Sequence, residues 1–139
     1  MAKVEIFTFF CEDVRDEAGG KSSYMGVLAD RVIYPANRKR LRGVVAVGIV
    51  RIQGLDRVDA TLEVAVPGRD EPLLLPLEGV GSDDGYDPWT IQMHAGLNNI
   101  PVQEGFELKS TLRCNGQVAT ATVLQMIRSE SSEDVIELN

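Results

Sequence analysis

The residues of this chain best suited to catalysis are two cysteines, one histidine and several clustered carboxylates. Nucleophilic catalysis by serine or cysteine needs a nearby base, usually histidine, and a third group that orients that base. His94 is the one histidine, and it falls on the polar side of an alternating segment between Met93 and Ala95. This position predicts a histidine that faces solvent or is paired at the surface. We therefore expect no catalytic site and no enzyme.

Motifs for phosphate, dinucleotide and structural zinc binding are missing from the sequence. There is no G-x-S-x-G elbow, Walker-type loop or G-x-G-x-x-G fingerprint, and residues 79–81 run into acidic residues where a phosphate loop needs lysine. His94 and Cys114 show none of the short spacings of structural zinc sites. The sequence accordingly predicts no cofactor.

The acidic loop at residues 82–87 is the best candidate for a metal site. Asp83, Asp84 and Asp87 offer the carboxylate oxygens that calcium prefers, with Asp13 or Asp16 added if the loops share one end of the domain. The loop lacks the periodicity and distal glutamate of an EF-hand. A solvated turn is the preferred interpretation, and a calcium- or membrane-surface-binding C2-like domain is an alternative.

The net charge of −7 opposes a role in nucleic-acid binding, which depends on Lys and Arg neutralising phosphates. One basic cluster contains Arg38, Lys39, Arg40 and Arg42, between a proline-containing loop and a very apolar segment. We interpret this cluster as a solvated turn that protects a strand end from aggregation, with an anion site as the alternative.

The sequence predicts no membrane span, no export by a signal peptide, and free thiols. No apolar run reaches the roughly 20 residues of a membrane-spanning helix, and residues 1–5 lack the features of a signal peptide. Cys11 and Cys114 would pair only if their Cα atoms lay within about 7 Å. Without a secretory signal, unpaired cysteines are expected.

Period-two alternation of apolar and polar residues dominates the chain and predicts an all-β fold. Residues 44–52 are apolar on both faces and predict a central strand, whereas Pro76 assigns its strand to an edge or a bulge. About eight short strands at this spacing are typical of a sandwich or barrel, and we predict a single antiparallel β-sandwich. The expected strands are 4–11, 23–34, 44–52, 58–66, 73–80, 89–97, 106–114 and the one that follows the next turn.

Asn115-Gly116 predicts a β-hairpin, because a two-residue type I′ turn requires positive φ at both positions. A two-residue loop places Leu112 opposite Ala119 and Leu108 opposite Val123, so that large side chains meet small ones on the inner face.

Two further segments are expected to bear on recognition. Residues 12–21 predict a turn with one helical turn in it, ended by glycine. Residues 1–128 form the expected domain and 129–139 a polar, acidic tail, in which 135–138 regain apolar character. Such a stretch could add to a sheet edge of its own domain or of a neighbour.

Residues 10–27, FCEDVRDEAGGKSSYMGV, resemble the opening of a family of small bacterial proteins of unknown function. That family begins with a short strand, an acidic C-[DE]-D-V-R-x-E-like stretch, a glycine turn with lysine and a strand ending in I-G-V or similar. The resemblance covers about 25 residues closely. It implies a cytoplasmic, bacterial β-sandwich of immunoglobulin-like or C2-like topology, with no assigned activity and no assigned functional residues.

The charged part of this motif has two interpretations. Its glycines and lysine suit a tight reversal at the end of the sandwich. The alternative is a docking surface for an unidentified protein partner, made of Glu12, Asp13, Arg15, Asp16 and Glu17. The sequence thus favours a non-enzymatic protein-interaction module, leaves a homo-oligomer open, and keeps a structural subunit of a larger assembly as a further alternative.

Overall fold

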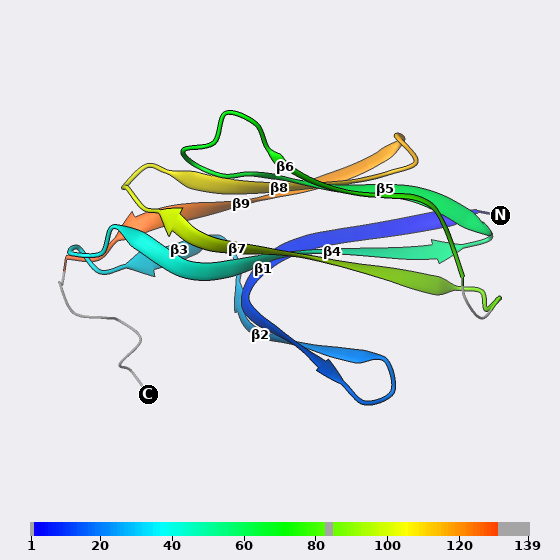
Figure 1. The fold of residues 1–139 in the computed structure, drawn as a ribbon. Coiled ribbons are helices and arrows are strands. Elements are labelled where there is room, and N and C mark those ends of the chain that lie inside the picture. Colours follow the sequence, from blue (N-terminus) through cyan, green and yellow to red (C-terminus); the bar gives the residue numbers. More distant parts are fainter. Residues whose placement is uncertain (1, 83–84, 131–139) are drawn as a thin grey trace.

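The computed structural model describes residues 2–82 and 85–130, which form two β-sheets packed face to face (Figure 1). The strands are β1 (Lys3–Glu17), β2 (Lys21–Leu28), β3 (Arg31–Tyr34), β4 (Arg40–Gln53), β5 (Arg57–Ala65), β6 (Leu73–Gly81), β7 (Trp89–Pro101), β8 (Glu107–Cys114) and β9 (Val118–Arg128). The predicted all-β class is confirmed, with nine strands in the described part of the chain.

One sheet has the strand order β2-β1-β4-β7, and the other has the order β3-β9-β8-β5-β6. Neighbouring strands are antiparallel except β3 and β9, which are parallel. β4 lies inside its sheet between β1 and β7, as its apolar pattern predicts. Pro76 lies on β6, an edge strand, which confirms that prediction as well.

The core lies between the sheets and is built from the alternating residues that face inward. In β4 these include Ala46, Val50 and Ile52, each with no exposed surface. The opposite sheet contributes Leu62 and Leu112, which are equally buried. Burial of such side chains contributes roughly 1.5–3 kcal/mol each to folding before entropy is subtracted.

Two predictions for the N-terminal third are wrong. Residues 12–21 contain no helical turn: β1 continues to Glu17, and a turn at residues 18–20 leads into β2. The expected strand at residues 23–34 is two strands, β2 and β3, which belong to different sheets. Residues 29–30 form the bend between them, and alternation on each side of a short bend cannot reveal a change of sheet.

The hairpin at Asn115-Gly116 is confirmed, but its predicted register is wrong by one residue. Both residues have positive φ, 55° and 66°, and the Gln117 N–H donates to the Cys114 carbonyl at 3.1 Å. The ladder nevertheless resumes one residue later, with Cys114 opposite Val118. A shift of one residue turns every β9 side chain to the other face. Inward positions therefore hold Thr120, Thr122, Leu124 and Met126 instead of Ala119, Ala121 and Val123.

We expect Gly116→Val to lower the free energy of unfolding by more than 1 kcal/mol, as measured by urea denaturation. The space around Gly116 is open, so the cost comes from a β-branched residue at φ 66°. Gly96→Val is the matched control, because Gly96 also has open space around it but lies in β7 without a positive φ. Equal effects of the two substitutions would contradict the turn geometry.

Candidate functional site

The distal part of the β1–β2 hairpin leaves the plane of its sheet and forms an arm, defined here as residues 12–27 (Figure 1). Pairing of β1 with β4 ends at the Cys11–Val45 pair, whereas pairing of β1 with β2 continues to Glu17–Lys21. Beyond Cys11, β1 therefore pairs with no described strand other than β2.

The arm folds across the outer face of its sheet and is anchored there by Tyr24. Three strand spacings, about 14 Å, separate β2 from β7 in a flat sheet. The Tyr24 hydroxyl nevertheless donates to Gln92 Oε1 at 2.9 Å and lies 3.1 Å from His94 Nε2, both on β7. Because the single hydroxyl proton goes to Gln92, His94 Nε2 is the donor to Tyr24. The sharp bend of β1 brings Tyr24 within reach of β7 and so makes these contacts possible.

Aromatic packing supports the same anchor. The rings of Phe9 and Tyr24 meet edge to face with centroids 5.2 Å apart, and the rings of Tyr24 and His94 do so at 5.5 Å. Phe9, Val47 and His94 occupy one row across the sheet, and Val47 has no exposed surface although it faces outward. His94 is thus paired at the surface, as its sequence position predicts.

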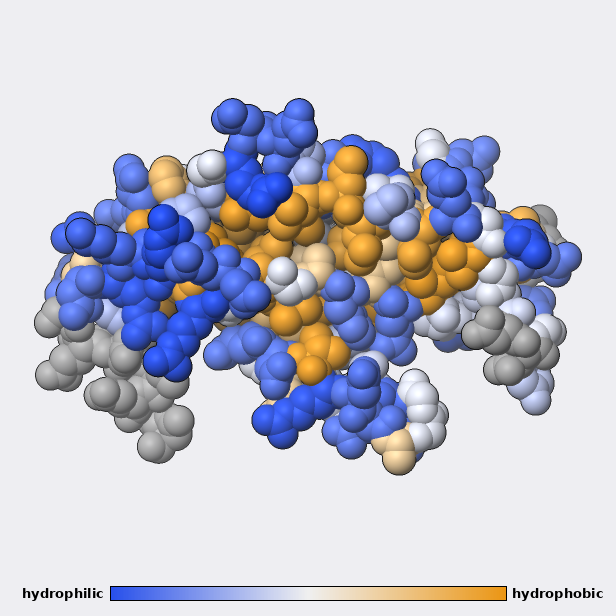
Figure 2. Space-filling view, viewed as in Figure 1, coloured by the Kyte–Doolittle hydropathy of each residue, from blue (hydrophilic) through white to orange (hydrophobic). Residues whose placement is uncertain are grey.

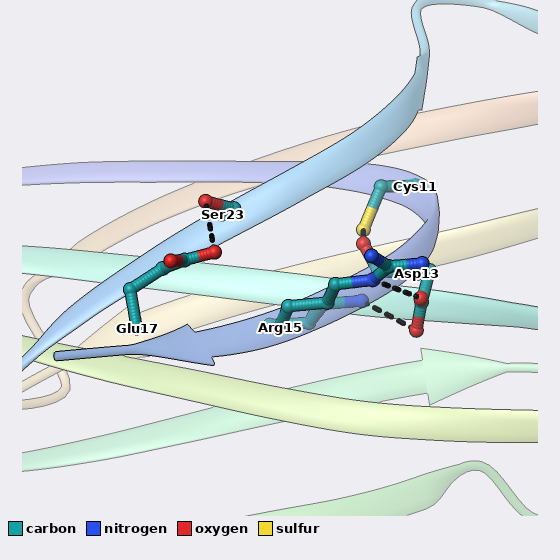
Figure 3. Close-up of polar contacts among 6 residues, drawn as sticks. Cys11, Asp13, Arg15, Glu17 and Ser23 are labelled. Atoms are coloured by element: carbon teal, nitrogen blue, oxygen red, sulfur yellow. Dashed lines mark hydrogen bonds and ion pairs between the residues drawn. The ribbon is translucent and has the colours of Figure 1, made fainter.

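All five residues predicted to form a docking surface lie on the arm and are exposed. Figure 3 shows Asp13 bound within its own strand, accepting from the Val14 N–H at 2.9 Å and lying 3.4 Å from Arg15 Nε. Glu17 accepts from the Ser23 hydroxyl at 3.2 Å, which links the two strands. Gly26, at φ 65°, leaves room for the Glu12 side chain to lie against the β2 backbone.

The arm combines negative charge with apolar side chains on an edge strand. Residues 12–21 hold four carboxylates and two cations, a formal charge of −4 + 2 = −2. Met25 and Val27 on β2 are 43% and 57% exposed. β2 is the last strand of its sheet, so one side of its backbone has no strand partner in the described structure. An exposed edge strand with these properties is one to which a further strand can add.

The predicted calcium loop is described only in part. Asp83 and Asp84 lie outside the described residues. Asp87 accepts from the Gly54 N–H at 2.9 Å and so joins its loop to the β4–β5 turn. Asp13 and Asp16 belong to the arm. Within residues 2–82 and 85–130, no group of three or more His, Cys, Asp or Glu side chains is placed to hold a metal ion.

The two cysteines are buried, unpaired and on different sheets. Burial raises the pKa of the Cys11 thiol above its ordinary value of 9.0, and the nearby Asp13 and Glu12 carboxylates raise it further. Burial is also the main cause of the raised pKa of Cys114, with a smaller contribution from Asp59. Both groups are therefore held as thiols, the form that is a poor nucleophile.

We expect the stability of the protein to fall above about pH 9 through these thiols. Their raised folded-state pKa values favour the folded state fully below pH 9, and this contribution is lost as the thiols of the unfolded chain ionise. The loss reaches about 1.4 kcal/mol per pH unit for each thiol. Urea denaturation from pH 7 to 10 should show a steeper decline for the natural chain than for Cys11→Ala with Cys114→Ala. Parallel declines in the stability of the two proteins would contradict this contribution of the thiols.

A second candidate site is an apolar groove of about 480 Å³ beside β3, which the sequence interpretation missed. Its charged lining comprises Arg31, Arg38 and Arg42 with Glu12. Arg40 of the basic cluster instead donates to the Asn99 carbonyl at 2.9 Å. The spacing of Arg38 and Arg42 at the start of a predicted strand was the one sequence signal for this groove. Arg31 joins these two arginines only in the folded chain. The apolar lining consists of Leu28, Val32, Ile33, Tyr34, Pro35, Leu41 and Val44.

The side of the sandwich between the edge strands β6 and β7 also carries apolar surface (Figure 2). Leu73, Leu75 and Leu77 of β6 and Trp89 of β7 are partly buried against the core. The Trp89 indole N–H donates to the Leu55 carbonyl at 2.9 Å, which fixes the ring at this margin. These side chains complete the core at its open side.

None of the described residues forms a helix that is long and apolar enough to span a membrane. Comparison with protein-family models gives no match, and a search of the curated proteins finds no significantly similar sequence.

Proposed function

We propose that this domain is a non-enzymatic protein-interaction module and that the β1–β2 arm is its docking element. The observation that carries the proposal is the arm itself, a charged hairpin folded out of its sheet and anchored by Tyr24 to β7. Anchoring matters because an element that is already ordered loses less conformational entropy on binding.

The chemistry of the arm specifies the kind of partner. An extended segment can add to the free side of β2 through backbone hydrogen bonds. Met25 and Val27 offer apolar contacts, and the net negative charge of residues 12–21 favours a basic segment. We therefore propose a basic, β-prone segment of another protein as the partner. The resemblance of residues 10–27 supports a bacterial, cytoplasmic setting and an immunoglobulin-like or C2-like type of sandwich.

The test is affinity capture from a lysate of the source organism with the natural chain and with Asp16→Lys plus Glu17→Lys. We expect the charge reversal to reduce recovery of the specific partner at least tenfold, because the basic segment then meets like charge. A matched control exists in Asp70→Lys plus Glu71→Lys, an exposed acidic pair in the β5–β6 loop with the same change of charge.

The apolar contribution is tested separately. Met25→Ser with Val27→Ser should also reduce recovery, whereas Leu74→Ser, an exposed apolar residue of β6, should not. Equal recovery by the arm variants and their controls, with the fold intact by circular dichroism, would show that the arm is not the docking element.

A further inference from the structure

We propose that the β3 groove binds the C-terminal segment of this same chain, residues 131–139. Three features of the groove lead to this occupant: its position next to the end of β9, its positive charge in an acidic protein, and its apolar floor. The proposal is independent of the docking role of the arm.

The position follows from the parallel pairing of β3 with β9. Tyr34 lies opposite Arg128, and the Ser129 N–H donates to the Tyr34 carbonyl at 2.8 Å. Tyr34 also lines the groove, so the chain leaves β9 beside it. Nine further residues, at roughly 3.3 Å each when extended, reach about 30 Å, which is ample for a site that starts at this point.

The charges of the two surfaces are complementary. The groove carries three arginines and one glutamate, a formal charge of 3 − 1 = +2, in a chain of net charge −7. Residues 131–139 hold Glu133, Asp134 and Glu137 and no cation, a charge of −3. Arg31 forms an ion pair with Asp30, with Nε 3.2 Å from Oδ1. Arg42 lies exposed at the rim of the groove.

The apolar side chains match as well. Val135, Ile136 and Leu138 lie close in sequence to Glu133, Asp134 and Glu137, so that one short segment contains both kinds of group. The floor of the groove offers Leu28, Val32 and Leu41, all partly buried. Because the segment is tethered, its effective concentration is on the order of millimolar, and a weak intrinsic affinity is enough to keep it bound.

The test uses a chain truncated after Glu130 and a fluorescein-labelled peptide of residues 131–139. We expect the truncated protein to bind the peptide in fluorescence anisotropy, and the full-length protein to bind it at least tenfold more weakly because its own segment competes. Arg31→Glu with Arg42→Glu in the truncated protein should weaken binding at least tenfold. Arg51→Glu with Lys109→Glu, two exposed cations outside the groove lining, is the matched control.

Stability and mass provide two further readouts. Truncation should lower Tm by about 3 °C or more, and the full-length protein should be a monomer by light scattering. A dimer that truncation dissociates would mean that the segment occupies the groove of a second copy, which overturns docking within one chain. Absence of peptide binding to the truncated protein, or equal binding by the groove variant, would overturn the proposal altogether.

Discussion

Gly48→Val should destabilise the fold by about 2 kcal/mol, because a side chain at this position would crowd core leucines of the opposite sheet. A Cβ atom at Gly48 would lie 3.2 Å and 3.3 Å from the two methyl carbons of Leu112, and 3.4 Å from one of Leu62. The backbone of Gly48 is extended, so the expected cost arises from overpacking alone. Urea denaturation with an unchanged m value would measure it.

The partner substitution makes this prediction specific. Leu112→Ala alone should cost about 2–5 kcal/mol, since it leaves a cavity in the core. In the double variant, valine at position 48 fills part of that cavity, and we expect the combined cost to be at least 1 kcal/mol below the sum. Additive effects would mean that the two residues do not meet between the sheets.

Thr8→Val should cost about 1–3 kcal/mol, because it removes a polar bridge between the sheets. Thr8 Oγ1 donates to the Val47 carbonyl at 2.9 Å and lies 2.9 Å from Ser110 Oγ. Since the Thr8 hydroxyl proton is already used, Ser110 donates to Thr8. Ser110 has no exposed surface, so loss of its acceptor leaves a buried hydroxyl without a partner.

A double substitution separates this mechanism from a simple loss of packing. Ser110→Ala removes the hydroxyl donor that Thr8→Val leaves without an acceptor. The variant Thr8→Val with Ser110→Ala should therefore be more stable than Thr8→Val alone. Thr90→Val, an exposed threonine of β7, is the matched control and should change stability by less than about 0.5 kcal/mol. A neutral Thr8→Val would contradict the assignment of donor and acceptor.

The strands were predictable because most of them have one face toward the core, and this produces alternation in the sequence. The register of the β8–β9 hairpin was not predicted correctly. The prediction assumed that pairing resumes directly after a two-residue loop, whereas it resumes one residue later, at Val118. Leu124 and Met126, two large apolar residues at even positions, were the signal for the correct inward face.

The candidate sites depend on contacts that no local pattern contains. The charged residues of the arm were identified, but their placement requires the bend of β1 and the contact of Tyr24 with β7. The groove is lined by both Arg31 of β3 and Arg42 of β4, two strands of different sheets. Residues brought together by such packing are recognisable only in the folded chain.

The most direct test of the docking role is amide hydrogen exchange of the natural chain, alone and saturated with the partner recovered by capture. Addition of a strand to β2 requires that its free backbone N–H groups become hydrogen-bonded, and this slows their exchange. We predict that new protection is concentrated in β2, residues 21–28, with smaller changes along the rest of the arm. Protection confined to β6, β7 or the β3 groove, with unchanged exchange in β2, would contradict the proposed function.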